Sequence, residues 1–183
     1  METLLALMVT SLVALASFWL LDAVLRGTRS GDNLRRSNMR LEVLAERIDS
    51  RFRSAAKVVY ATKDVVVLWT GDRRANESYD LSELCLIYHD KAKKQLRCYE
   101  GKPDLTEAED ATMESDNDFQ LLIAGANANK DLKSTTWAEQ VKSWSFSFDA
   151  AEETSARAMA YDYALESPEG PVATRRTVAM RGM

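Results

Sequence analysis

TLLALMVTSLVALASFWLL, Thr3 to Leu21, is a run of 19 residues without a single charged side chain. At about 1.5 Å rise per residue, a helix over this run is roughly 28 Å long, close to the hydrocarbon thickness of about 30 Å. Its hydroxyl residues do not oppose insertion, because each can bond to a carbonyl of the preceding turn. The run therefore predicts a transmembrane helix over residues 1–25.

A cleaved secretory signal is the alternative interpretation of this run. An Ala-x-Ala pattern, typical of a cleavage site, occurs at Ala14–Ala16. The apolar run is, however, longer than the roughly 7 to 15 residues of a signal-peptide core, and it lacks the basic segment that usually precedes one. We favour the membrane anchor.

Helical periodicity continues beyond the apolar run and predicts an amphipathic helix over residues 26–56. One face is apolar, through Leu34, Leu41, Leu44, Ile48 and Phe52. The opposite face is charged and is expected to be solvated, through Arg35, Arg36, Arg40, Glu42, Glu46, Arg47, Arg51 and Arg53. Such a helix packs one side on a folded domain and turns the other to water.

A break is expected between the two helical halves. Gly27 and Gly31 lower the helix propensity there, and Ser30 or Asp32 could cap a restarted helix. We expect a kink or a melted turn at this point.

After about Ala56 the hydrophobic period changes from helical to extended. Seven runs rich in β-branched or aromatic residues predict strands at Lys57–Thr62, Val65–Thr70, Leu84–His89, Gln95–Tyr99, Val141–Phe148, Ala156–Leu165 and Val172–Met180. The turn residues of Ser167–Pro171 predict that the last two runs form an antiparallel hairpin. The acidic segment Leu105–Lys133 is expected to be a loop with one short helix at Phe119–Ala124.

The order of elements predicts an α+β fold, in which a long N-terminal helix packs on a mostly antiparallel sheet. Residues 57–183 would form the only globular domain, since 183 residues leave room for one domain and an anchor. In Val141–Phe148 the alternation predicts that Trp144, Phe146 and Phe148 are buried and the intervening serines exposed.

The charge and the few chemically reactive residues exclude several classes of function. With 24 basic and 28 acidic residues the formal net charge is -4. This charge balance does not indicate electrostatic binding to nucleic acid. One histidine and two cysteines cannot build a zinc site of the usual ligands without carboxylates. We predict no enzyme activity, no cofactor and no metal. His89, the only imidazole, is not tied by spacing to a nucleophile and a carboxylate, so a general-base role is not favoured.

Cys85 and Cys98 flank the turn Asp90–Lys93. Pairing His89 with Lys94 across this turn places the two cysteines directly opposite each other. Opposed Cβ atoms about 4.5 to 5.5 Å apart allow a disulfide only with local twist. A disulfide and a pair of buried thiols both remain open.

The segment Asp72–Glu83 carries a degraded calcium-loop pattern. Oxygen ligands fall at positions 1, 5, 7, 9 and 12 of the pattern, in Asp72, Asn76, Ser78, Asp80 and Glu83. Arg74 takes a ligand position, and Glu77 replaces the glycine needed for the sharp turn. A solvated turn between strands is the favoured interpretation.

The start of the chain, Met1-Glu2-Thr3-Leu4-Leu5-Ala6-Leu7, resembles the start of a type IV pilin or of a type II secretion pseudopilin. In that family a short leader ending in glycine is cut by a prepilin peptidase and leaves a Phe-Thr-Leu-x-Glu beginning. Glu2 matches that glutamate, so the leader and the first three mature residues would precede this chain. The order of anchor, amphipathic helix and sheet is also the family's order, and the final hairpin is most similar to that of J-type minor pseudopilins.

The resemblance implies that Glu2, Thr3, Leu4 and Leu5 take part in assembly. Glu2 would neutralise the terminal amine of a neighbouring subunit as the apolar helices bundle, because a carboxylate at the edge of an apolar helix needs a positive partner. The alternative is a carboxylate at the membrane interface, where a helix N-terminus mildly favours its charge.

The resemblance implies a subunit of a secretion or pilus-like filament, anchored by a single pass in the inner membrane with its C-terminal domain in the periplasm. Its partners would be other pilin or pseudopilin subunits and the prepilin peptidase. The arginines after the apolar run oppose this orientation under the positive-inside rule, which the basic residues of a leader would offset. A minor pilin for DNA uptake or adhesion, and an unrelated single-pass protein with a sensory or scaffolding domain, are the alternatives.

Overall fold

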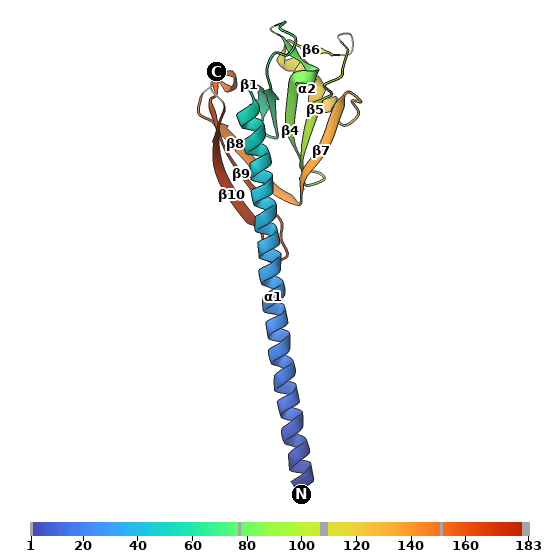
Figure 1. The fold of residues 1–183 in the computed structure, drawn as a ribbon, viewed down its shortest axis with the longest axis vertical. Helices are drawn as coiled ribbons and strands as arrows, with labels where there is room; N and C mark the ends of the chain where they lie inside the picture. Colours follow the sequence, from blue (N-terminus) through green and yellow to red (C-terminus); the bar gives the residue numbers. More distant parts are fainter. Residues whose placement is uncertain (1, 77, 107–109, 151, 181–183) are drawn as a thin grey trace.

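The computed structural model describes residues 2–76, 78–106, 110–150 and 152–180, and among these the side chains of residues 2–6, 9, 29 and 153 are not described. Its dominant element is α1 (Glu2–Ser54), one helix of 53 residues. At 1.5 Å per residue it is about 80 Å long. Its first half projects alone, and its second half carries the folded domain (Figure 1). The predicted N-terminal helix is confirmed, and we call the folded part beyond it the head.

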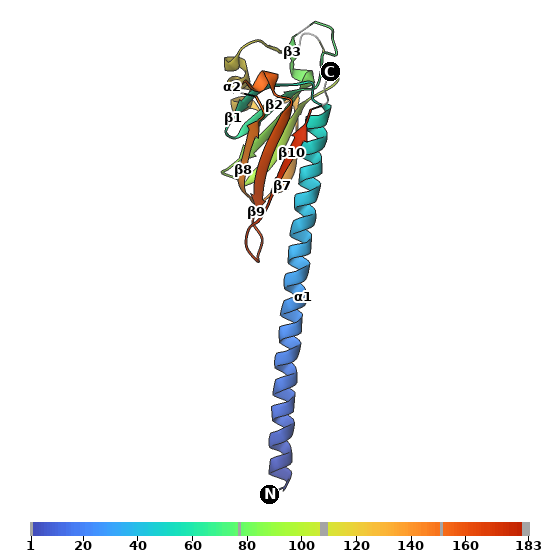
Figure 2. The same cartoon turned by 90° about the vertical axis from the view of Figure 1, so that its left-hand side faces the viewer.

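The predicted kink at Gly27 and Gly31 is wrong, because α1 is helical without interruption through both glycines. Figures 1 and 2 show a straight rod from two directions. Each glycine costs only about 1 kcal/mol relative to alanine, and no proline removes a backbone bond here. An ion pair of 2.5 Å between Asp22 and Arg26, one turn apart, supports the same stretch.

After α1 the described residues form three antiparallel sheets. The largest has five strands in the order β1 (Lys57–Thr62), β2 (Val65–Trp69), β4 (Leu84–Asp90), β5 (Gln95–Gly101) and β7 (Leu132–Glu139). A three-stranded sheet has the order β10 (Val172–Ala179), β9 (Ala158–Leu165) and β8 (Val141–Phe148). The third pairs β3 (Tyr79–Asp80) with β6 (Thr112–Met113). The remaining elements are α2 (Asp116–Gly125) and the short 3-10 helices η1 (Leu81–Glu83) and η2 (Glu153–Ser155). The α+β class is confirmed.

All seven predicted strands are present, and β9 and β10 form the predicted hairpin. The short helix predicted at Phe119–Ala124 lies inside α2, which Ser115 begins with a capping box. The expected loop Leu105–Lys133 is wrong at two places, since it also contains β6 and the start of β7. Residues Lys133–Thr136 of β7 are all exposed, so this strand has no alternating pattern to reveal it.

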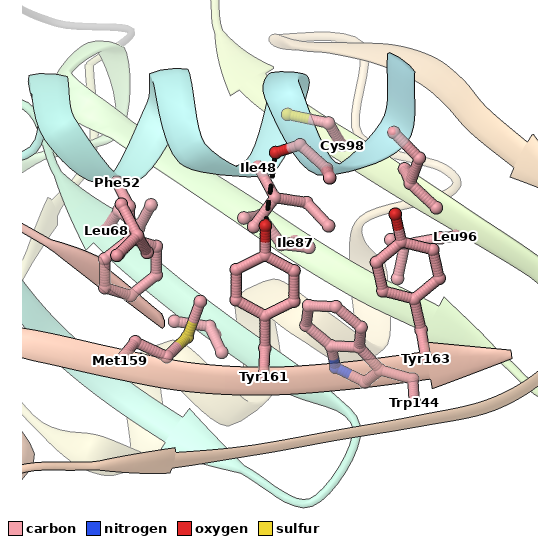
Figure 3. Packing of buried hydrophobic residues seen from close by; sticks show 14 of the residues in the cluster. Ile48, Phe52, Leu68, Ile87, Leu96, Cys98, Trp144, Met159, Tyr161 and Tyr163 are labelled. Carbon is pink, nitrogen blue, oxygen red and sulfur yellow. Dashed lines mark hydrogen bonds between the residues drawn. The ribbon is translucent and has the colours of Figure 1, made fainter. Parts of the chain in front are cut away.

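The head-proximal half of α1 packs on both larger sheets. Leu41, Leu44, Ile48 and Phe52 are buried, and they meet side chains of the five-stranded sheet on one side and of β8, β9 and β10 on the other. Figure 3 shows Tyr161 and Tyr163 of β9 pointing at the helix. Leu34, predicted on the same apolar face, is 41% exposed because it lies before the head begins.

The aromatic pattern of β8 follows the prediction for Trp144 and the serines, and only in part for the two phenylalanines. Trp144 is buried, Phe146 and Phe148 are half-buried, and Ser143, Ser145 and Ser147 are exposed. On the far side of the five-stranded sheet a second core gathers Tyr99, Phe119 and Leu122, so that α2 covers that face.

Candidate functional site

The first half of α1, which we call its apolar half, exposes an unusually large apolar surface. Eleven large apolar side chains between Leu7 and Leu25 are from 45% to 71% exposed, namely Leu7, Met8, Leu12, Val13, Leu15, Phe18, Trp19, Leu20, Leu21, Val24 and Leu25. Covering each would contribute about 1.5 to 3 kcal/mol, which sums to roughly 17 to 33 kcal/mol. Soluble monomers do not leave such a surface in water.

This helix is long and apolar enough to cross a membrane, and none of its most apolar stretch is buried against the head. The hydroxyls of Ser11 and Ser17 donate to the carbonyls of Met8 and Val13, at 2.8 and 2.9 Å. A hydroxyl bonded within its own helix carries little cost into lipid. The surface therefore suits either lipid or other apolar helices.

A polar clamp joins α1 to the hairpin β9–β10. The Tyr161 hydroxyl donates to Asp49 Oδ1 at 2.6 Å, and the Tyr163 hydroxyl donates to the Leu41 carbonyl. Arg176 of β10 pairs with Glu42 and lies 3.6 Å from Asp49. Burial raises the pKa of both tyrosines, so they remain donors at neutral pH. The clamp fixes the helix to the head at its buried end.

Little in the sequence indicates this clamp. Its only local signal is Asp49, an acidic residue next to Ile48 on the apolar side of the helix. A carboxylate at such a position needs a partner from elsewhere in the chain, but the sequence does not say which.

A groove of about 580 Å³ lies beside α1, between the helix and the end of β7. Met39 and Val43 of α1 line it, 58% and 50% exposed, together with Trp137 of β7. Arg47 closes one side by donating to the Trp137 carbonyl at 3.3 Å. A second, smaller apolar patch of α1 thus lies at the level of the head, separated from the first by the mostly charged and polar residues 26–38.

The residues that the resemblance assigns to assembly lie in the first turns of α1. Glu2, Thr3, Leu4 and Leu5 are helical, but their side chains lie outside the described part of the chain. Their role stays a prediction.

The predicted register of Cys85 and Cys98 is wrong. In the structure Asp90 pairs with Gln95, so Cys85 faces Glu100 and Cys98 faces Ile87, a shift of two residues from the expected pairing. The cysteines are diagonal neighbours with their sulfurs 3.4 Å apart, and both are buried free thiols. Of the two interpretations, the structure has the pair of buried thiols.

Two carboxylates of the calcium-like segment, Asp80 and Glu83, are used in hydrogen bonds within the head. Glu83 is fully buried and accepts hydrogen bonds from Trp69 Nε1 and from the Arg73 amide, at 2.8 and 2.5 Å. Asp80 is 1% exposed and accepts from Asn76 at 2.8 Å. Among the described residues they do not gather with other acidic groups at metal-ligand spacing. The expected solvated turn is wrong for these two side chains, because both are buried.

His89 lies on β4 and is 4% exposed. Burial lowers the pKa of its imidazole below the ordinary value of 6.5, and the Val141 backbone and the Asp64 carboxylate oppose that shift only in part. The folded head therefore holds a neutral histidine.

Acid is expected to destabilise the head through His89. Below about pH 6.5 the unfolded chain takes up a proton that the folded chain does not, so stability is lost as the pH falls toward the folded-state pKa. The slope can reach about 1.4 kcal/mol per pH unit. Urea unfolding between about pH 7 and pH 5 measures it, and His89→Gln should flatten the profile. An equally steep profile in the variant would assign the acid sensitivity to other groups.

Comparison with known proteins finds no matching family model and no curated protein of significant similarity.

Proposed function

We propose that this chain is a membrane-anchored structural subunit of an extracytoplasmic filament of the pilin-like kind. The observation that carries the proposal is a single continuous helix that exposes an uncharged, mostly apolar surface from Leu7 to Leu21 and whose second half is built into a folded head. A membrane anchor alone needs no such rigid continuity. A filament subunit does, since the position of its helix must fix the position of its head.

The work of such a subunit is mechanical. In the membrane the apolar half of α1 is covered by lipid, and in the filament it is covered by the helices of sister subunits. Lipid tails and apolar side chains are similar environments, so the exchange is driven by packing and by specific polar contacts. The clamp of Tyr161, Tyr163 and Arg176 then carries the load from the helix to the head.

The finer assignment is a J-type minor pseudopilin that supports protein secretion, with its head in the periplasm and other pseudopilins as partners. The exposed Met39 and Val43 and the adjoining groove offer a lateral contact surface at head level. Glu2 pairs with the terminal amine of the neighbouring subunit and sets the stagger between helices.

Glu2→Ala tests the assembly role. It should lower incorporation into sheared filaments by about two orders of magnitude, because breaking a buried ion pair costs about 3 to 5 kcal/mol. The measurement is the ratio of filament-bound to membrane-bound protein by immunoblot, in cells that carry the assembly machinery. The urea midpoint of the head should not change.

Glu46→Ala is the matched control, since Glu46 lies exposed on the same helix beside the head. Normal incorporation of Glu2→Ala would remove the charge-pairing role. Failure of the unaltered chain to enter any filament would favour a single-pass protein with a sensory or scaffolding domain.

A further inference from the structure

Three potential metal ligands converge beneath α1. Because Cys85 faces Glu100 across the β4–β5 ladder, and Cys98 precedes Glu100 by two residues, all three side chains lie on one face of the sheet. Both thiol sulfurs and a carboxylate oxygen of Glu100 lie within 4.8 Å of one another. The two cysteines belong to the core that α1 covers.

The spacing of the sulfurs fits a shared metal better than a covalent bond. Two thiolates bound tetrahedrally to one zinc ion at about 2.3 Å are roughly 3.8 Å apart. A disulfide needs about 2.05 Å. The observed distance of 3.4 Å between the sulfurs is nearer to the distance across a zinc ion than to a disulfide bond. The diagonal register also places the backbones of Cys85 and Cys98 further apart than in a directly opposed pair.

The local charges also fit a divalent cation. Two thiolates and one carboxylate around a dication leave one negative charge, and the Arg51 guanidinium that pairs with Glu100 neutralises it. A buried site of zero net charge avoids the cost of an uncompensated ion. The Glu100 and Arg51 side chains are 30% and 44% exposed, so the cluster borders solvent on their side.

We propose that Cys85, Cys98 and Glu100 form a binding site for zinc, with water as the fourth ligand. Each thiol releases one proton as its sulfur binds, and the metal keeps its charge, so no oxidant or reductant is required. The bound ion ties β4 to β5 directly under the head-proximal half of α1. This site is independent of the proposed filament function.

The site should bind metal more tightly as the pH rises. Both thiols must lose their protons before the sulfurs can bind the ion, so the apparent affinity should rise by up to about 100-fold per pH unit.

Cobalt(II) is the probe for this site, since its thiolate complexes absorb in the near ultraviolet. The reduced full chain in detergent micelles should develop a thiolate-to-cobalt band that saturates at one ion per chain, and zinc should abolish it. Glu100→Gln should weaken binding by at least about 10- to 100-fold, the range that even outer-shell partners of metal sites show. Cys98→Ser should remove the band.

Glu139→Gln is the matched control, because Glu139 is an exposed carboxylate on β7. It should bind cobalt like the unaltered chain. The Glu100 variant keeps both core thiols, so a result from it stands even if Cys98→Ser does not fold. Absence of the band, undiminished binding in Glu100→Gln, or a mass two hydrogens lower that shows a native disulfide would each overturn the proposal.

Discussion

Gly101→Ala is expected to destabilise the head by more than about 3 kcal/mol, enough to unfold a marginally stable domain. Gly101 ends β5 where the backbone of η1 crosses it. A Cβ atom at this position would lie 1.9 Å from the Leu81 carbonyl oxygen and 2.6 Å from the Ser82 Cα. Both obstacles are backbone atoms, which cannot rotate away as a side chain can. Glycine in a strand marks such a close approach.

Gly125→Ala provides the control for this prediction. Gly125 is the last residue of α2, and a Cβ there would meet nothing within 4 Å. Alanine is the better helix former by about 1 kcal/mol, so this variant should be unchanged or slightly more stable. Urea unfolding followed by circular dichroism compares the two variants. Equal midpoints would show that η1 can move away from β5 without cost.

The helix and most strands could be predicted because their signals are local. The apolar run and the periodicity of Leu41, Leu44, Ile48 and Phe52 report which side of each element is buried, and burial decides the fold. The strand β7 has no such signal, since its exposed middle is held by backbone bonds to β5. Periodicity in sequence detects burial and not backbone pairing.

The register of β4 and β5 could not be predicted because it depends on the geometry of one turn. Lys94 has a φ of 52°, in the left-handed region that non-glycine residues seldom adopt. Asp90 supports the turn by accepting from the Lys93 amide at 3.1 Å, and it pairs with Gln95. Lys94 belongs to the turn, so the expected pairing of His89 with Lys94 does not form.

The candidate sites depend on contacts that are distant in sequence. Glu100 lies opposite Cys85 only because the register differs by two residues from the expected one. The cluster of Cys85, Cys98 and Glu100 therefore could not be predicted without the correct register. The clamp between Asp49 and Tyr161 likewise joins residues 112 positions apart. Sequence patterns predict the elements better than they predict which side chains meet.

Leu12→Asp combined with Leu15→Asp is expected to remove the chain from the membrane. One aspartate in the middle of a membrane helix costs about 2.5 to 3.5 kcal/mol, so the pair should cost about 5 to 7 kcal/mol. Leu12 and Leu15 are 57% and 60% exposed and lie on the projecting half of α1, so the head should fold unchanged. Extraction of cell membranes with alkaline carbonate, followed by immunoblot, measures the fraction that stays integral.

Leu121→Asp separates membrane insertion from a general effect of adding charge. Leu121 lies on α2 of the head and is 64% exposed, about as much as Leu15, but it is distant from the apolar half of α1. Its variant should remain as resistant to carbonate as the unaltered chain, because in the proposed topology the head lies outside the membrane. If the double variant stays integral as well, the apolar half of α1 is not the membrane span, and its exposed surface must be covered by protein instead.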